Sequence, residues 1–234
     1  QCIPHLSAAA GELYVFQRTP SSIDIRNNCD IDPDWFGELE PGWQDQWLMN
    51  FTTLQTGGFA DEDLVKDGWT DLSQRIRDRM VEMVNDDPSA FSREAFLSAY
   101  RDCDDEKMEE IRARVDSLVA DDGTADALKP WYRQFCKRPT FNDDFLATFN
   151  RDNVHLVDVS ASKGVDGITE KGVMANGEEI ELDCLIFATG FEITTSAHRR
   201  VDFDTRGRNG QSLYDHWGKG FRTLHGLSSH GFPN

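Results

Sequence analysis

The chain has 234 residues, a hydrophobic content of 38% and an aromatic content of 11%, which suffice for a packed core and exclude wholesale disorder. Its formal net charge of −18 argues against nucleic acid and anionic membrane surfaces as partners, and no apolar run approaches the roughly 20 residues of a membrane span. The five cysteines are scattered without a CxxC pair and the N-terminus carries no secretory signal, so we expect reduced thiols in a cytoplasmic protein.

The acidity is concentrated in the middle of the chain. Residues 21–135 hold 27 acidic and 12 basic residues, so a net charge of −15 lies in this block and only −3 is left for the rest. This distribution predicts an acidic segment inserted into a domain of a different kind.

A helix followed by a short buried strand is predicted at the N-terminus. The first ten residues suit a helix that Gly11 stops, and residues 13–16 (LYVF) form a continuous apolar run of strand type. A helix, a glycine and a strand make the second half of a βαβ unit, so we expect the chain to start in mid-domain, as a fragment. Arg18 and Thr19 follow the strand, and Pro20 stops it.

Residues 21–135 show helical periods. Two apolar stripes recur at helical spacing between acidic and basic residues, and turn sequences at 87–89 and 121–123 divide the block. The stripes consist of Trp69, Leu72, Ile76, Met80 and Met83, and of Met108, Ile111, Val115 and Leu118. We interpret both stripes as packing faces and the charges opposite them as a solvated surface.

After Pro139 the pattern changes to strands. Residues 154–157 are strand-like, and residues 172–182 read as a hairpin that turns at Asn176-Gly177. Residues 184–190 (CLIFATG) form a nearly continuous apolar run, which predicts a strand buried on both faces, as in a parallel sheet. The tail, 191–234, has little periodicity and no closing element, which we interpret as a second sign of truncation.

Arg18 and Thr19 are candidates for binding a phosphate. At the tip of the second strand of a dinucleotide-binding βαβ unit, an Arg accommodates the 2′-phosphate of NADP, and a Thr hydroxyl adds a donor. The simpler alternative is an Arg that only ends a strand. Lys137 and Arg138 form a cation pair where the chain leaves the acidic block, and such a pair is either a second counter-charge for phosphate or a solvated surface pair.

The small residues Ala188, Thr189 and Gly190 would let a cofactor approach the backbone closely, although a simple strand-to-loop turn explains them equally well. The six histidines lack metal-ligand spacing, so no metal site is expected. The sequence contains no P-loop, no G-x-S-x-G and no complete G-x-G-x-x-G.

Five short motifs follow one another along the chain: residues 15–20 (VFQRTP), 136–139 (CKRP), 149–154 (FNRDNV), 187–191 (FATGF) and 231–234 (GFPN). In this order they resemble the Baeyer–Villiger monooxygenases, a family of flavoproteins that depend on FAD and NADPH. Five motifs in the right order are far more specific than any one of them. The acidic helical block is also similar in place to the helical insertion in the NADP domain of that family.

The resemblance implies a mechanism and roles for individual residues. NADPH reduces bound FAD, O₂ adds to give a flavin peroxide, and the peroxide attacks a ketone, which rearranges to an ester or lactone. Arg18, Thr19 and Lys137 match residues that hold the 2′-phosphate of NADPH. Arg138 matches the active-site arginine that stabilises the anionic peroxide and the oxyanion of the adduct, an effective use of a fixed cation.

The predicted fold class is α/β: a partial Rossmann-like NADP-binding domain, with a parallel sheet and a β-meander, interrupted by an all-α helical insertion. We expect residues 1–22 to be the first part of the NADP-binding domain, 23–135 the acidic helical insertion and 136–190 the second part of that domain. Residues 191–234 would begin the return to an FAD-binding domain.

Two other functions remain open at this stage. One is a related NADPH-dependent flavoprotein that oxidises nitrogen or sulfur, and the other is a non-catalytic acidic interaction module built on the helices. Because the glycine loops for both cofactors are absent from the sequence, we expect the isolated chain to bind FAD poorly and to be inactive.

Overall fold

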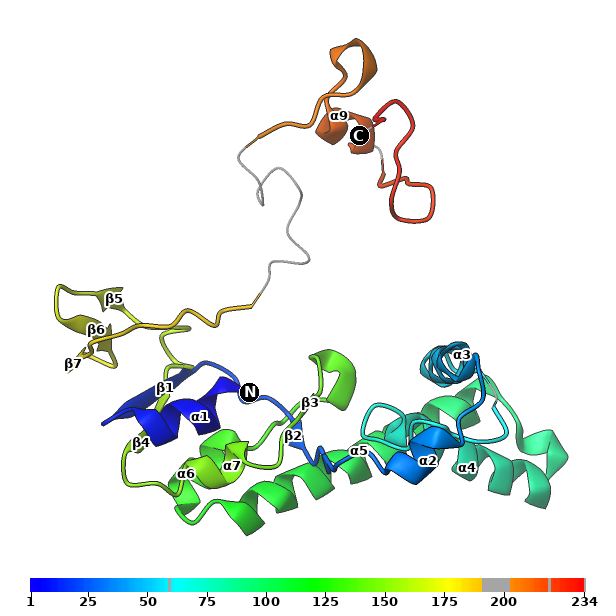
Figure 1. Cartoon of the computed structure of the whole chain (residues 1–234), viewed down its shortest axis with the longest axis horizontal. Coiled ribbons are helices and arrows are strands. Elements are labelled where there is room, and N and C mark those ends of the chain that lie inside the picture. Colours follow the sequence, from blue (N-terminus) through cyan, green and yellow to red (C-terminus); the bar gives the residue numbers. More distant parts are fainter. Residues whose placement is uncertain (59, 191–202, 219, 234) are drawn as a thin grey trace. The chain divides into compact units, whose positions relative to one another are not determined.

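The computed structural model describes residues 1–58, 60–190, 203–218 and 220–233, and the chain divides into two units, Gln1–Asp183 and Cys184–Asn234 (Figure 1). The helices of the first unit are α1 (Cys2–Ala9), α2 (Pro33–Gly37), α3 (Trp43–Gln55), α4 (Asp71–Asp86), η1 (Pro88–Ala90), α5 (Arg93–Leu118), α6 (Asp122–Leu128), η2 (Gln134–Cys136) and α7 (Phe145–Thr148). Its strands are β1 (Leu13–Gln17), β2 (Ile23–Asp24), β3 (Thr140–Phe141), β4 (Val154–Asp158), β5 (Gly167–Ile168), β6 (Gly172–Ala175) and β7 (Glu178–Glu181).

The N-terminal helix and strand expected from the sequence are both present. Strand β1 pairs in parallel with β4, with Leu13 opposite Val154 at one end of the register. The side chain of Asn153 donates hydrogen bonds to the carbonyl oxygens of Ser7 (3.0 Å) and Ala10 (2.9 Å), which satisfies acceptors at the end of α1. The loop before β4 therefore joins α1 to the parallel pair.

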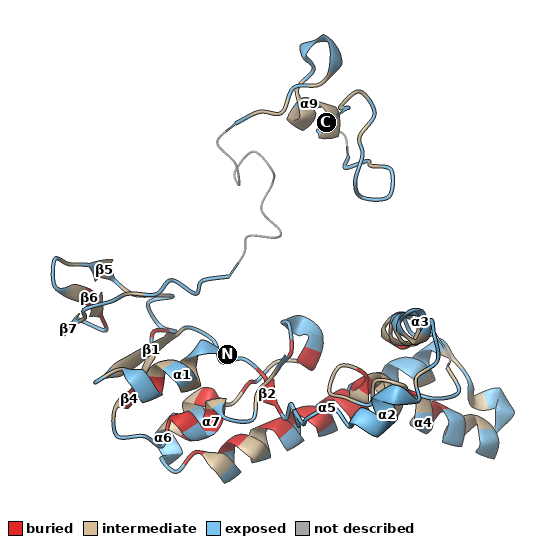
Figure 2. Ribbon diagram, in the orientation of Figure 1, coloured by how far each residue is buried: buried red, intermediate tan, exposed pale blue. Residues whose placement is uncertain are grey.

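One hydrophobic core is shared by the strands and the helical block. Val115 and Val119, at the end of α5, are buried together with Leu146 of α7 and Val154 of β4. Leu13 and other partly buried residues of the parallel pair pack against the same cluster. The acidic block is thus continuous with the α/β part through its core, and buried residues recur along α5 (Figure 2).

The two apolar stripes are packing faces, as expected. Leu72, Ile76 and Met80 of α4 are buried against Ala99 and Cys103 of α5. The residues Met108, Ile111 and Val115 are each only 1% exposed, although they sit in a helix rich in charges. The charges opposite are mostly solvated, but two residues depart from that expectation because Asp104 and Lys107 on α5 are buried.

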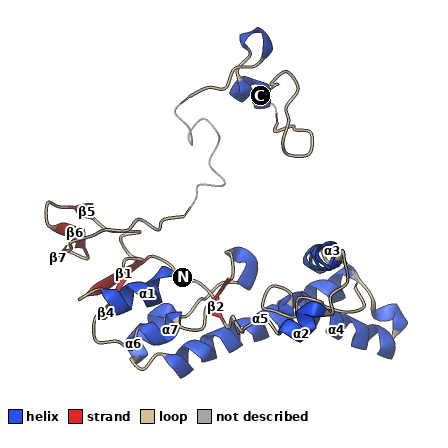
Figure 3. Ribbon diagram, viewed as in Figure 1, coloured by secondary structure: helices blue, strands red, loops and turns tan. Residues whose placement is uncertain are grey.

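The helical block is entered through β2 and left through β3, which pair in parallel, and α2 to α6 lie between them in the chain (Figure 3). The carbonyl oxygen of Ser22 accepts hydrogen bonds from the backbone nitrogen (3.1 Å) and the hydroxyl (2.7 Å) of Thr140. The two ends of the block are therefore held together where it leaves the α/β part.

Strands β5, β6 and β7 form an antiparallel sheet, and the β6–β7 hairpin turns at the predicted residues. Asn176 and Gly177 have φ angles of 52° and 82°, which are the positive values that a type I′ turn requires at both positions. The Asn-Gly pair was therefore a reliable signal of the hairpin.

The predicted strand at 184–190 is absent. This segment has no regular secondary structure, and Ile186 and Phe187 are 57% and 68% exposed. A strand buried on both faces needs a hydrogen-bonded neighbour, and these residues pair with no strand in the described part of the chain. The fold is therefore a mixed α/β arrangement with small parallel and antiparallel sheets, and this apolar run does not contribute to them.

The second unit contains η3 (Arg208–Gly210) and α9 (Leu213–Trp217), together with short bridges such as Leu224 to Ser228. The Ser212 hydroxyl caps α9 by accepting a hydrogen bond from the nitrogen of Asp215. Within the described parts of the chain, no helix combines the length and the apolar character needed to cross a bilayer.

Candidate functional site

Arg18 and Thr19 lie directly after β1, at the carboxyl end of a parallel strand, and both are exposed. The preceding residue, Gln17, is anchored because its side-chain nitrogen donates a hydrogen bond to the carbonyl oxygen of Ala127 (2.8 Å). Open α/β sheets bind their ligands at the carboxyl ends of parallel strands. The two candidate residues therefore occupy the edge at which such a ligand is bound.

Tyr132 fastens the segment that follows Thr19. Its hydroxyl donates to the carbonyl oxygen of Pro20 (2.9 Å) and accepts from the backbone nitrogen of Ser22 (3.0 Å). Burial raises the pKa of Tyr132, against the lowering effect of the Ser22 hydrogen bond, so the hydroxyl keeps the proton that it donates. The sequence interpretation missed this residue, although the aromatic pair directly after Pro130 was a signal.

Lys137 lies near Tyr132, which also contacts the segment that follows Arg18. The ammonium nitrogen of Lys137 lies 5.4 Å from the ring centre of Tyr132. Loss of hydration and, second, the positive charge of Arg18 lower the pKa of Lys137 below its ordinary value. Neither cation has a carboxylate partner within the described residues, although the chain is strongly acidic. Arg18 and Lys137 are thus two unpaired like charges in this part of the chain, and each is linked to Tyr132 or to the segment that Tyr132 holds.

Arg138 faces a different environment from its neighbour. Lys137 has extended backbone (φ −131°, ψ 164°), and successive side chains of extended backbone point in opposite directions. The guanidinium carbon of Arg138 lies 5.2 Å from the ring centre of Trp69, which stands edge-on to Phe141 at 5.2 Å. The helical block therefore supplies the aromatic surface on which Arg138 rests.

This aromatic surface depends on Gly68, a second residue that the sequence interpretation did not single out. A Cβ atom at Gly68 would lie only 2.1 Å from a ring carbon of Phe141. Any larger residue would push Phe141 away and disturb its contact with Trp69.

Helix α5 anchors both segments that carry the cations. Its buried Asp104 accepts hydrogen bonds from the Arg133 guanidinium (2.8 Å) and the backbone nitrogen of Gln134 (3.0 Å). One turn further on, the buried Lys107 lies 2.7 Å from a carboxylate oxygen of Asp24 in β2. The start of the segment leading to Lys137 and the strand that follows Pro20 are thus tied to one helix.

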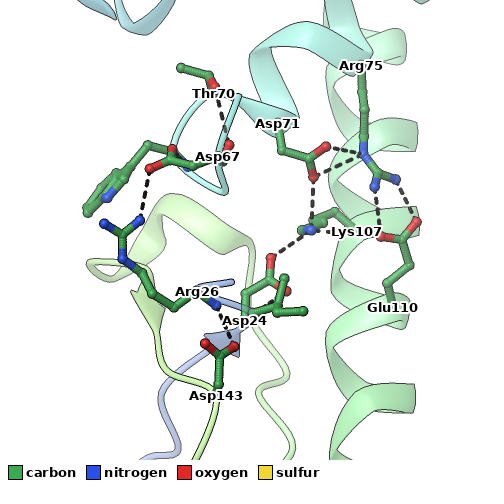
Figure 4. A network of polar contacts seen from close by, with 11 residues as sticks. Asp24, Arg26, Asp67, Thr70, Asp71, Arg75, Lys107, Glu110 and Asp143 are labelled. Atoms are coloured by element: carbon green, nitrogen blue, oxygen red, sulfur yellow. Dashed lines mark hydrogen bonds and ion pairs between the residues drawn. The ribbon is translucent and has the colours of Figure 1, made fainter. Parts of the chain in front are cut away.

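Figure 4 shows the network around Lys107. The lysine nitrogen also lies 2.9 Å from Asp71, whose carboxylate accepts from Arg75, and Arg75 in turn forms two hydrogen bonds with Glu110. Burial opposes the charge of Lys107, but the hydrogen bonds with Asp24 and Asp71 outweigh it and raise its pKa. The same pairing lowers the pKa of Asp71 despite partial burial. Each charge of this cluster has an oppositely charged partner within the protein.

A cleft of about 1010 Å³ borders this network. Its lining includes six acidic and five basic residues, and none of the predicted site residues. Arg26, Lys66, Arg75 and Lys107 are already paired with carboxylates of the same lining, so the cleft offers little positive charge to a dinucleotide phosphate.

The remaining candidates, Ala188, Thr189 and Gly190, belong to the second unit. All three are exposed, and Gly190 has a φ angle of 81°, in the region that favours glycine. Their part in cofactor binding stays a prediction.

No protein-family model matches the chain. The chain is 47% identical over 234 residues to a Baeyer–Villiger monooxygenase of Stachybotrys chlorohalonatus, covering 100% of the chain and 37% of that protein. It is 47% identical over 237 residues to neopentalenolactone D synthase of Streptomyces avermitilis, with 39% of that protein covered. The chain thus spans about two fifths of the length of these curated relatives.

Solved structures agree with these relatives. The polycyclic ketone monooxygenase of Thermothelomyces thermophila matches with a TM-score of 0.78 and 35% identity, over 100% of this chain and 38% of that one. A structure of OTEMO in complex with FAD and NADP matches with a TM-score of 0.64 and 26% identity, over 98% of this chain and 42% of that one. By sequence and structure, the whole chain therefore matches a part of the Baeyer–Villiger monooxygenases, the family that its five motifs resemble.

Proposed function

We propose that the chain is the NADP-binding part of a Baeyer–Villiger monooxygenase, which uses NADPH, FAD and O₂ to convert a ketone into an ester or lactone. The observation that carries the proposal is that Tyr132 contacts both Lys137 and the segment directly after Arg18, although the two cations come from opposite ends of the helical block and have no carboxylate partner in the described chain. Two adjacent cations without a counter-charge fit a doubly charged phosphate group.

The 2′-phosphate of NADPH would lie between Arg18 and Lys137. The guanidinium of Arg18 offers a fork of donors, the ammonium of Lys137 offers a compact charge, and Thr19 adds a hydroxyl donor. A phosphate there would offset the loss of hydration and, second, the repulsion by Arg18 that now lower the pKa of Lys137. NAD lacks this phosphate, so these residues would select NADP.

Arg138 would act at the reacting atoms. Its guanidinium rests on Trp69, on the side of the chain away from Lys137, and remains charged at any working pH. A fixed cation aimed at developing negative charge on oxygen stabilises the transition state. FAD, when bound, supplies the redox and oxygen chemistry, and the small residues Ala188, Thr189 and Gly190 would let it or NADPH approach the backbone.

Calorimetric titration of the purified chain with NADP⁺ and with NAD⁺ tests the cofactor site. We expect NADP⁺ to bind more tightly than NAD⁺. Arg18→Ala is expected to lower the ratio of the two affinities about tenfold or more, the size expected for a hydrogen bond to a charged group. Arg101→Ala, at an exposed arginine on α5, is the control and leaves the preference unchanged. Equal binding of both dinucleotides, or no binding of either, would contradict the proposal and favour an acidic interaction module.

Catalysis is tested in a chimera in which this chain replaces the matching part of the Stachybotrys chlorohalonatus relative. We expect ketone-dependent oxidation of NADPH with formation of an ester or lactone, and a loss of about 10²–10³ in rate for Arg138→Ala. Retained flavin absorbance shows that the variant still folds. Oxidation of amines or sulfides without any product from ketones would favour the nitrogen- or sulfur-oxidising alternative.

The chain alone is expected to bind FAD poorly and not to turn over, because its sequence has no complete glycine loop for either cofactor. Stoichiometric flavin absorbance of the purified chain, together with ketone-dependent NADPH oxidation, would contradict this expectation.

A further inference from the structure

The two cations of the proposed phosphate site come from segments far apart in the chain. Arg18 follows β1, before the helical block, whereas Lys137 follows η2, after it. Like charges repel, so a contact between the two segments has to hold them in place. Tyr132 provides such a contact.

We infer that Tyr132 is a positioning residue of the 2′-phosphate site: its hydroxyl ties the segment after Arg18 to the segment that carries Lys137, and its ring supports the Lys137 ammonium. The inference rests on the proposed function, because it assigns the role of Tyr132 within the NADP site. Tyr132 itself is not required to touch the cofactor.

The hydroxyl of Tyr132 uses both its donor and its acceptor capacity. It donates to the carbonyl oxygen of Pro20 (2.9 Å) and accepts from the nitrogen of Ser22 (3.0 Å). Ser22 is only 1% exposed, and its carbonyl oxygen is held from the other side by Thr140. The short link from Thr19 to β2 is therefore fixed at successive points of its backbone.

The ring of Tyr132, in contrast to its hydroxyl, contacts Lys137. The Lys137 nitrogen lies 5.4 Å from the ring centre, within the range of a cation–π contact. A long, flexible lysine loses rotamer freedom when it binds a ligand, and a side chain already resting on a ring loses less. Hydroxyl and ring together thus hold Lys137 and the segment after Arg18 on one residue before any ligand arrives.

A generic packing role would not need these hydrogen bonds. Tyr100 on α5 is also partly buried, yet its hydroxyl has no hydrogen-bond partner within the described residues. The same fold therefore accommodates one phenol without such bonds and uses the other to join two segments. Tyr100→Phe is accordingly a matched control for Tyr132→Phe.

The first test compares NADP⁺ with NAD⁺ as titrants of the full chain. We expect Tyr132→Phe to lower the preference for NADP⁺ about fivefold, the size of one net hydrogen bond, while affinity for NAD⁺ stays constant. Tyr132→Leu also removes the ring and lowers the preference further. Tyr100→Phe leaves the preference unchanged, and equal effects of Tyr132→Phe and Tyr100→Phe would overturn the inference.

A double-mutant cycle separates positioning from general stability. If the hydroxyl of Tyr132 acts by placing Arg18, Tyr132→Phe causes little further loss of NADP⁺ preference in an Arg18→Ala background. The same fivefold loss in both backgrounds would show that the two residues act independently and would overturn the inference.

A measurement without ligand distinguishes failure of this inference from failure of the proposed function. Titration of Lys137 by NMR is expected to show that its pKa rises in Tyr132→Phe, because Arg18 is no longer held beside it, and is unchanged in Tyr100→Phe. An unchanged pKa in Tyr132→Phe would overturn the role of Tyr132. Equal binding of NADP⁺ and NAD⁺ by the wild-type chain would instead refute the NADP site itself.

Discussion

Lys107 and Lys137 show two opposite uses of a lysine in one chain. Lys107 is 7% exposed and lies 2.7 Å and 2.9 Å from the carboxylates of Asp24 and Asp71, which raise its pKa. Lys137 is exposed and lies near another cation, and its pKa is lowered. Loss of hydration opposes the charge of both lysines, so it is the carboxylate partners of Lys107, which Lys137 lacks within the described residues, that decide which cation is complete within the fold and which is available to a ligand.

The largest expected effect is the loss of stability when Lys107 is removed from its ion pairs with Asp24 and Asp71. Lys107→Met would leave Asp24 and Asp71 without their shared counter-charge, which we expect to lower the free energy of unfolding by about 3–5 kcal/mol. Urea denaturation followed by circular dichroism measures this change. Lys66→Met, which removes an exposed pair with Glu62, is the control and leaves stability nearly unchanged. Similar effects of the two substitutions would show that the buried cluster contributes no more than a surface pair.

The pH dependence of stability tests whether Asp71 depends on its ion pair with Lys107. In the wild-type chain the pKa of Asp71 is lowered, so its contribution is present above the ordinary value of 3.8 and is lost as pH falls through the lowered value. Without Lys107, only Arg75 opposes the effect of burial on Asp71, so the pKa of Asp71 is lowered less. We therefore expect Lys107→Met to lose less stability than the wild type as the pH falls below about 4, as measured by urea denaturation. Parallel pH profiles would contradict this assignment.

A smaller effect is expected from disturbing the surface beneath Arg138. Gly68→Ala forces Phe141 to move, because the new Cβ would lie 2.1 Å from its ring, and we expect a loss of about 1–3 kcal/mol. Thermal unfolding measures the loss, and a change in tryptophan fluorescence would report displacement of Trp69. Gly123→Ala in α6, where the nearest atom is 3.4 Å away, is the control and should be neutral or slightly stabilising. A stable Gly68→Ala protein with unchanged fluorescence would show that the close approach is unimportant.

The smallest effect concerns the unpaired cations. Phosphate binding favours charged Lys137, so the affinity for NADP⁺ is expected to fall as pH rises through the pKa of Lys137, which lies below 10.5. In Arg18→Gln the repulsion is removed, so the fall occurs at higher pH. Calorimetric titration across alkaline pH tests this shift, with NAD⁺ as the control ligand. An identical pH profile in Arg18→Gln would show that the two cations do not interact.

Several elements could be predicted because their cause is local. The stripe through Leu72, Ile76 and Met80 predicted the packing face of α4, and the Asn176-Gly177 pair predicted the hairpin turn. The prediction of a strand at 184–190 was wrong for the opposite reason. An apolar run indicates a suitable strand, but strand formation depends on a partner, which lies elsewhere in the chain.

The residues of the candidate site likewise include some that the sequence predicted and some that it did not. Arg18 and Lys137 were identified from their motifs, whereas Tyr132 and Gly68 act through residues distant in sequence and left only weak signals. The charges of the acidic block were interpreted as a solvated surface. That was correct for most of them and wrong for Asp24, Asp63, Asp104 and Lys107, which are buried. The burial of Asp104 and Lys107 depends on partners in other elements.

By itself, the sequence determined the periodic helices, the hairpin and the five motifs that relate the chain to Baeyer–Villiger monooxygenases, because each of these depends on residues close together in the chain. Tertiary structure alone decided that β1 pairs with β4, that α5 anchors both ends of the helical block and that Tyr132 contacts both Lys137 and the segment after Arg18. Such contacts join residues from different elements, and their energies depend on distance, burial and the sign of nearby charge, which only the folded chain sets.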